Sequence, residues 1–184
     1  MRKAATVTAE AEHHAQSFAP VIDVGAKLLI LGSMPGQRSL QQQQYYAHPR
    51  NAFWPIMAEL LGFDAELPYA ERLARLQRHG IALWDVLAEC RRPGSLDSSI
   101  VEQSIRPNDF AALLDLHPTI EAIFFNGAKA EQAFNRYVLK GLPDHLQQLP
   151  RQRLPSTSPA HAAMKLAQKS HCWRQQLDAI LRIG

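Results

Sequence analysis

Four short apolar runs, separated by longer segments with helical spacing, constrain the fold of this chain most. The runs cover residues 27–31, 80–84, 120–125 and 151–154. The last, Arg-Gln-Arg-Leu, is weak alone and depends on the breaker Pro155 that follows it. Continuous apolar runs of this length are typical of strands that are buried on both faces of a sheet. Because helical segments lie between them, the connections are crossovers and the strands run parallel. The sequence predicts an α/β fold, a three-layer α/β/α sandwich with a short parallel sheet of about four strands.

Capping residues and breakers set the expected ends of the helices. Asn51 precedes the first helical segment as an N-cap, and Pro107 falls in the first turn of another. For the last helix, Ser158 is the expected N-cap and Pro159 falls in the first turn. The predicted helices cover residues 53–61, 70–78, 107–116, 128–139 and 160–181.

Length and composition exclude several classes of protein. A chain of 184 residues fits one domain, here 1–184 with a flexible tail at 1–17. We expect a cytoplasmic protein, since it has neither a secretory signal nor an apolar run near the roughly 18 residues of a membrane span. A net charge of +3 limits any nucleic-acid contact to a local patch. Cys90 and Cys172 are too few for a disulfide scaffold or a four-thiolate metal site.

Polar and turn-forming residues follow each predicted strand. They are the Gly-Ser-Met-Pro-Gly turn at 32–36, then Asp85, Asn126 and the segment 155–161. Because ligands bind outside the carboxyl ends of strands in open parallel sheets, we expect a site at this edge.

The turn formed by Gly32, Ser33, Met34, Pro35 and Gly36 could bring backbone N–H groups close to a ligand. It lacks the Lys of a phosphate-binding Walker loop and the GxGxxG spacing of a dinucleotide site. A plain tight turn is the alternative interpretation.

The segment 45–54 combines four aromatic residues with a His, an Arg and an Asn. Aromatic faces beside basic and amide groups suit a nucleobase that is stacked and oriented. We interpret Tyr46 and Asn51 as functional, and Phe53 and Trp54 as the start of a core helix.

Hydroxyl groups gather in the segment 155–161, where Ser156, Thr157, Ser158 and His161 could hold a DNA phosphate at a helix N-terminus. Capping of that helix is a compatible alternative. Asp85 could read a base edge or act as a cap, and we interpret Asp97 as a turn or cap residue. The other histidines have no metal-ligand spacing.

Together these segments resemble the uracil-DNA glycosylase superfamily, and most closely its hypoxanthine (deoxyinosine) branch. The resemblance rests on LLILGSMPGQRSLQQQQYYAHPRNAFW at 28–54, GIALWDVL at 80–87, IFFNGAKA at 123–130 and LPSTSPAHA at 154–162. It implies an enzyme that flips a deaminated base out of DNA and hydrolyses its N-glycosidic bond. It also implies a monomer whose partner is DNA, with no metal, cofactor or membrane.

The resemblance assigns roles to individual residues. Tyr46 corresponds to the residue that stacks on the base, and Asp85 to the one that reads its edge. Where uracil-specific branches carry a water-positioning Asp or Asn, the first-strand turn offers only Ser33 or Met34. Leu154 stands where those branches carry a catalytic His, and His161 matches a later position. These departures favour the hypoxanthine branch, in which we expect catalytic help from Asn51.

Three alternatives stay open from the sequence. The first is a uracil or mixed-specificity glycosylase of the same superfamily. The second is an esterase-like hydrolase with Ser33 as nucleophile and His161 as base, although no acid stands at a diagnostic spacing. The third is a non-catalytic module that binds nucleotides at the same edge.

Overall fold

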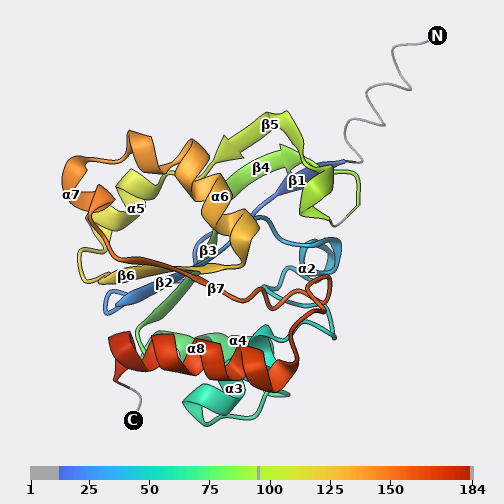
Figure 1. Cartoon of the computed structure of the whole chain (residues 1–184), viewed down its shortest axis with the longest axis vertical. Coiled ribbons are helices and arrows are strands. Elements are labelled where there is room, and N and C mark those ends of the chain that lie inside the picture. The colour runs from blue at the N-terminus through green and yellow to red at the C-terminus, as the bar shows by residue number, and fades with distance from the viewer. Residues whose placement is uncertain (1–12, 95, 183–184) are drawn as a thin grey trace.

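A parallel sheet of four strands forms the centre of the molecule, in a computed structural model that describes residues 13–94 and 96–182. Its order is β3-β2-β6-β7 (Figure 1). The strands are β2 (Leu28–Gly32), β3 (Ile81–Asp85), β6 (Ala122–Asn126) and β7 (Arg151–Leu154). Each overlaps one predicted run, so the predicted parallel sheet is confirmed.

Alternate residues of β2 bury their side chains on opposite faces of this sheet. Leu28 and Ile30 face a core shared with α3 (Phe53–Leu61), α4 (Tyr69–Arg78) and α8 (Leu166–Leu181). Leu29 and Leu31 face the opposite core. That core is shared with α5 (Phe110–Leu116), α6 (Ala128–Tyr137) and α7 (Asp144–Gln147). The two helical layers lie below and above the sheet in Figure 1, which confirms the three-layer sandwich.

A second, antiparallel sheet was not predicted. It has the order β1-β4-β5 and consists of β1 (His14–Gln16), β4 (Leu87–Arg91) and β5 (Val101–Pro107). It lies at one end of the molecule, beside α6 (Figure 1). The sequence has no apolar run at β5, because most of that strand is exposed. The pairing of β5 with β4 is also irregular, with shifts of register. A 3-10 turn at Asp97–Ser99 joins β4 to β5.

Two helices begin later than predicted. Pro107 ends β5, and α5 begins at Phe110 because the Asp109 side chain accepts a hydrogen bond from the backbone N–H of Ala112 at 3.0 Å. The last helix begins at Leu166 rather than at 160. Its first turn is closed by the Gln168 side chain, which accepts from the N–H of Lys165 at 3.0 Å.

Part of the segment predicted as a flexible tail forms a strand. Residues 1–12 lie outside the described part, but residues 14–16 form β1, which pairs with β4. The next residue, Ser17, donates its backbone N–H to the carbonyl of Ala88 at 2.8 Å. In the described ranges no helix has the length and apolar character needed to cross a membrane.

Register brings the strand ends together. Gly32 pairs with Asp85 across β2 and β3, and Asn126 pairs with Leu154 across β6 and β7. The loops that follow these strands therefore meet at one edge of the sheet. A short helix, α2 (Gln37–Gln42), begins directly after the turn that follows β2.

Candidate active site

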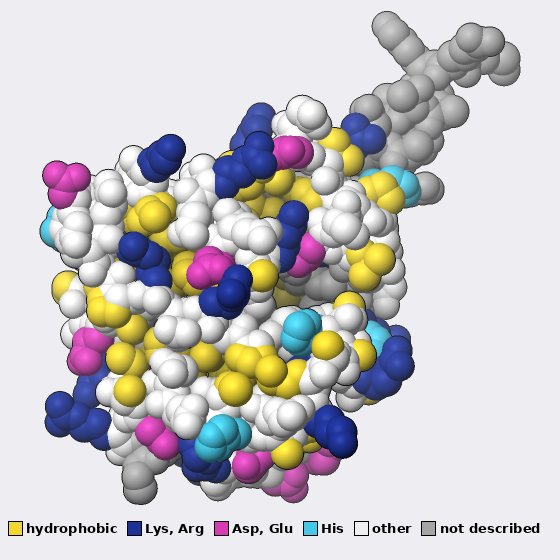
Figure 2. Space-filling view, viewed as in Figure 1, with side chains coloured by type: hydrophobic (Ala, Val, Ile, Leu, Met, Phe, Trp, Pro, Cys, Tyr) yellow, Lys and Arg dark blue, Asp and Glu magenta, His cyan; other side chains and the backbone are white. Residues whose placement is uncertain are grey.

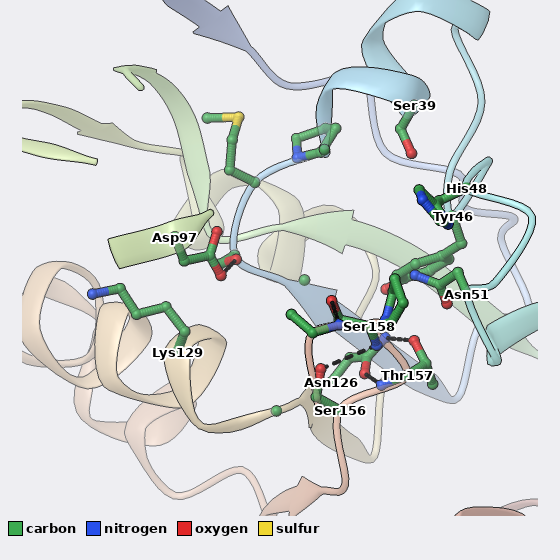
Figure 3. A pocket seen from close by; sticks show the side chains of 18 of the residues that line it. Ser39, Tyr46, His48, Asn51, Asp97, Asn126, Lys129, Ser156, Thr157 and Ser158 are labelled. Atoms are coloured by element: carbon green, nitrogen blue, oxygen red, sulfur yellow. Dashed lines mark hydrogen bonds between the residues drawn. The ribbon is translucent and has the colours of Figure 1, made fainter. Parts of the chain in front are cut away.

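A cavity of about 920 Å³ lies at the carboxyl ends of the parallel strands. Figure 3 shows it with Tyr46, His48 and Asn51 on one side and with Asp97 and Lys129 on the other. Every site residue predicted from the sequence lines this cavity: Gly32, Ser33, Met34, Pro35, Gly36, Tyr46, Asn51, Asp85, Asn126, Ser156, Thr157, Ser158 and His161.

Tyr46 is held in the left-handed backbone region, with φ of 57°. Non-glycine residues rarely adopt this region, and those that do often occupy functional sites. The preceding residue is fixed on both sides: Tyr45 donates its N–H to the Tyr69 hydroxyl, and its carbonyl accepts from the Trp54 indole, each at 2.9 Å. The Tyr46 ring stacks on Phe53 with centroids 4.0 Å apart. Among the described residues its buried hydroxyl has no hydrogen-bond partner.

Asp85 forms the floor of the cavity and is only 3% exposed. Its Oδ2 accepts a hydrogen bond from the Ser17 hydroxyl at 2.8 Å. Its Oδ1 lies 2.5 Å from the place that a Cβ on Gly32 would occupy, so glycine is required there. Burial raises the pKa of Asp85 to about 7, against opposing effects of the Ser17 hydrogen bond and of Arg92.

Asn51 joins the aromatic loop to α3. Its Oδ1 accepts from the backbone N–H of Phe53 at 3.0 Å. Ala52, not Asn51, is the N-cap residue by position, although the Asn51 side chain satisfies the first helical N–H. The N–H of Ala52 in turn donates to the carbonyl of Thr157 at 2.9 Å. The two loops that border the cavity are therefore tied together.

Asn126 and Thr157 form a paired contact. The Asn126 Nδ2 donates to the Thr157 hydroxyl, and the Thr157 N–H donates to the Asn126 Oδ1, each at 2.8 Å (Figure 3). Thr157 is 1% exposed, so its side chain supports the loop from within instead of facing DNA. Ser156 and Ser158 are half-buried beside it, and His161 is exposed.

No helix begins at the hydroxyl-rich segment, which corrects the predicted phosphate site at a helix N-terminus. The N–H of His161 donates to the carbonyl of Ser158 at 3.0 Å and closes a turn. The carbonyl of His161 accepts from the Nζ of Lys169, an α8 residue that is 5% exposed, at 2.8 Å. A buried lysine therefore fixes this turn against the last helix.

The wall opposite Tyr46 contains residues that the sequence did not identify. Ser33 donates its hydroxyl to Oδ2 of Asp97 at 2.5 Å. The Nη1 of Arg92 lies 3.7 Å from Oδ1 of Asp97, and its Nη2 donates to the carbonyl of Pro35. Asp97 lines the cavity but was not predicted as a site residue, because it lies between two strands of the unpredicted second sheet. Ser17 and Arg92 contact Asp85 and Asp97 and so support the cavity wall without lining it.

Positive charge is local at this site. Arg38, Arg50 and Lys129 are exposed and line the cavity mouth. On the face drawn in Figure 2, Lys and Arg side chains are interspersed with acidic and apolar ones. Within the described residues, no three His, Cys, Asp or Glu side chains gather in a way that could hold a metal ion.

Comparison with known proteins identifies relatives of this chain. A hypoxanthine DNA glycosylase of Methanosarcina barkeri is 41% identical over 116 residues, which span 62% of this chain and 72% of that protein. A hypoxanthine DNA glycosylase of Methanosarcina acetivorans is 39% identical over the same shares.

A solved structure has the same fold. It is the solution structure of a candidate uracil DNA glycosylase from Methanosarcina acetivorans, with a TM-score of 0.72 and 32% identity. The match covers 90% of this chain and 99% of that one. Residues 19–180 match the family described as the uracil DNA glycosylase superfamily, so the chain belongs to that superfamily.

Proposed function

We propose that this protein is a DNA glycosylase that hydrolyses the N-glycosidic bond of a deaminated base, above all hypoxanthine, after the nucleotide is flipped out of DNA. The observation that carries the proposal is one open cavity in which a stacking ring, a buried carboxyl and an amide converge. The chain is also about 40% identical to two hypoxanthine DNA glycosylases over 116 residues. The reaction would start base excision repair and needs no metal or cofactor.

The aromatic loop supplies the surface on which the base stacks. Phe53 already covers one face of the Tyr46 ring. The extruded base would therefore pack against the part of the Tyr46 ring that Phe53 does not cover and that faces the cavity. Stacking of a base on an aromatic side chain contributes about 1–3 kcal/mol.

Asp85 would read the edge of the base from the cavity floor. With a pKa of about 7, its carboxyl group exists in both protonation states near neutral pH. An ionised carboxylate accepts from the N1–H of hypoxanthine, whereas a protonated one donates to the neighbouring carbonyl oxygen. Either state therefore makes a hydrogen bond to this base.

Asn51 would act at the reacting bond by position, since an amide is not a base at neutral pH. Breaking the bond creates positive charge on the sugar and negative charge on the leaving base. The Asn51 amide and the backbone N–H groups of the 32–36 turn would stabilise the leaving base. DNA phosphates near the sugar would stabilise the cation, and Arg38, Arg50 and Lys129 would hold neighbouring phosphates.

The DNA-binding surface would include Ser156, Ser158 and His161, which border the mouth of the cavity. We also propose that the enzyme acts as a monomer and that the protein is cytoplasmic.

A substrate panel tests the proposal. Duplexes that carry one hypoxanthine, uracil or xanthine are incubated with the protein, abasic sites are cleaved with alkali, and the products are compared with those of an undamaged duplex. We expect cleavage at hypoxanthine in preference to uracil. If the folded protein cleaves none of the duplexes, the proposal is overturned, and if it cleaves only at uracil, the uracil alternative replaces it.

The esterase alternative is disfavoured by one contact. A serine nucleophile must pass its proton to a neighbouring base, but Ser33 donates its proton to Asp97, not to His161. At the position of the catalytic His of uracil enzymes, Leu154 is 3% exposed and packs in the core. Hydrolysis of simple esters by the folded protein would revive the alternative.

A further inference from the structure

The Ser33 hydroxyl has a fixed direction in the cavity wall. Its proton points to Oδ2 of Asp97, with 2.5 Å between the oxygens. A hydroxyl group has one donor and two acceptor positions. With the donor used, Ser33 can only accept a further hydrogen bond, and a water molecule in the cavity is the natural donor.

Asp97 is held in this position by a buried cation. The Arg92 side chain is 1% exposed and lies against Asp97 on one side and the carbonyl of Pro35 on another. The Nε of Arg92 also donates to the carbonyl of Gly94 at 3.2 Å. An arginine is always protonated, so it favours the ionised form of the neighbouring carboxyl. The wall thus contains a carboxylate with a defined orientation.

Asp97 also faces open space. Its side chain is 32% exposed and lines both the 920 Å³ cavity and an adjoining hollow of about 180 Å³. Figure 3 shows its carboxylate across the cavity from Asn51 and Tyr46. A base stacked at Tyr46 would therefore lie between the amide on one side and the carboxylate on the other.

We propose that Asp97 is a positioning residue that, through Ser33, orients the attacking water and takes up its proton. This inference rests on the proposed glycosylase function. The water oxygen bonds to C1′ of the sugar while the C1′–N bond breaks and its electron pair leaves with the base. The water proton passes to Ser33 as the Ser33 proton passes to Asp97, and the base takes a proton from solvent.

The surroundings suit Asp97 to this role. Burial raises its pKa, while the Ser33 hydrogen bond, Arg92 and the nearby Lys129 lower it. The carboxyl groups of Asp85 and Asp97 also repel each other electrostatically. The net effect is a raised pKa, so the Asp97 carboxylate is a stronger base than an exposed one.

The competing interpretation is that Asp97 only fastens the 32–36 turn to Arg92. Asp97→Asn separates the two, because an asparagine still accepts from Ser33 and keeps the shape of the wall. We expect the single-turnover rate of base release to fall by about 100-fold or more, the usual value for a proton-transfer group. The acid limb of the pH–rate profile, set by Asp97, should also disappear, while affinity for the substrate duplex stays within threefold.

Ser33→Ala should lower the rate by a similar factor, and Asp97→Asn/Ser33→Ala should be no slower than the slower single variant, since the two residues act as a unit. Asp115→Asn is the matched control, because Asp115 is exposed and outside the cavity. A rate within threefold of wild type for Asp97→Asn, or a retained acid limb, overturns the inference. So does a loss that only follows a lower unfolding temperature. If the wild type releases no base, the proposed function fails instead.

Discussion

The two sides of the cavity are built in opposite ways. Tyr46 and Asn51 come from one continuous loop, in which aromatic rings and short-range hydrogen bonds fix each residue. Ser33, Arg92 and Asp97 come from separate segments, and a carboxylate and a guanidinium hold them together. The first side presents a flat ring and an amide, and the second presents fixed charges.

This difference separates two chemical tasks. A flat ring and an amide suit an uncharged base, which needs stacking and oriented hydrogen bonds. Ionised groups suit the water and the sugar, where charge develops during bond cleavage. If the division holds, substitutions on the aromatic side should affect base release without unfolding the protein. Loss of the buried cation on the charged side should mainly destabilise it.

The largest expected effect tests the aromatic side. Asn51→Ala should lower the single-turnover rate of hypoxanthine release by about 10²–10³-fold, the range for removing one group that stabilises developing charge in the transition state. The variant also loses the hydrogen bond from Phe53 N–H to Asn51 Oδ1, which should cost about 1 kcal/mol of unfolding free energy. Rates and urea unfolding curves measure the two effects separately.

Asn51→Ser is the control for capping. A serine hydroxyl can accept the same Phe53 N–H, so its stability should lie near that of the wild type while the rate stays low. An Asn51→Ser protein as active as wild type would show that capping, not catalysis, explains this residue.

Arg92→Met tests the charged side. Removing one partner of a buried ion pair typically destabilises a protein by about 3–5 kcal/mol. Because the Asp97 side chain is 32% exposed, solvent screens part of the pair and we expect the lower end, about 3 kcal/mol, in urea unfolding. The double variant Arg92→Met/Asp97→Asn should lose less than the sum of its single changes. A loss below about 1 kcal/mol for Arg92→Met would mean that the charges do not hold this wall.

The same contrast explains how much the sequence could predict. Tyr46 and Asn51 lie within eight positions of Phe53 and Trp54, so their clustering is visible in a ten-residue window. The parallel strands are visible because their apolar runs are continuous. Asp97 reaches Ser33 across 64 positions, and β4 and β5 carry no apolar signal and pair with shifted register. Contacts of that kind depend on tertiary packing, which no local pattern encodes.

Tyr46→Ala should have a smaller effect than Asn51→Ala. Loss of base stacking is worth about 1–3 kcal/mol, or about 5- to 150-fold in the rate under subsaturating conditions. Tyr46→Phe is the matched control, because it keeps the ring on Phe53 and removes only the hydroxyl, so its rate should stay within a few-fold of wild type. Equal losses in both variants would assign the role to the hydroxyl instead of the ring.

The smallest effect concerns Asp85, beneath both sides of the cavity. Its pKa is raised from 3.8 to about 7, so the folded protein keeps a proton that the unfolded chain has lost between these values. The stability from this group is therefore complete below about pH 4 and falls as the pH rises through 7. Between pH 6 and 7 the loss should be about 1 kcal/mol, since one pKa unit corresponds to about 1.4 kcal/mol. Asp85→Asn imitates the protonated acid and should lack this component, while Asp115→Asn should retain it. Urea unfolding of all three proteins at both pH values measures the difference. An equal pH dependence in wild type and Asp85→Asn would mean that Asp85 is already ionised in the folded protein, and a purely accepting group would then read the base.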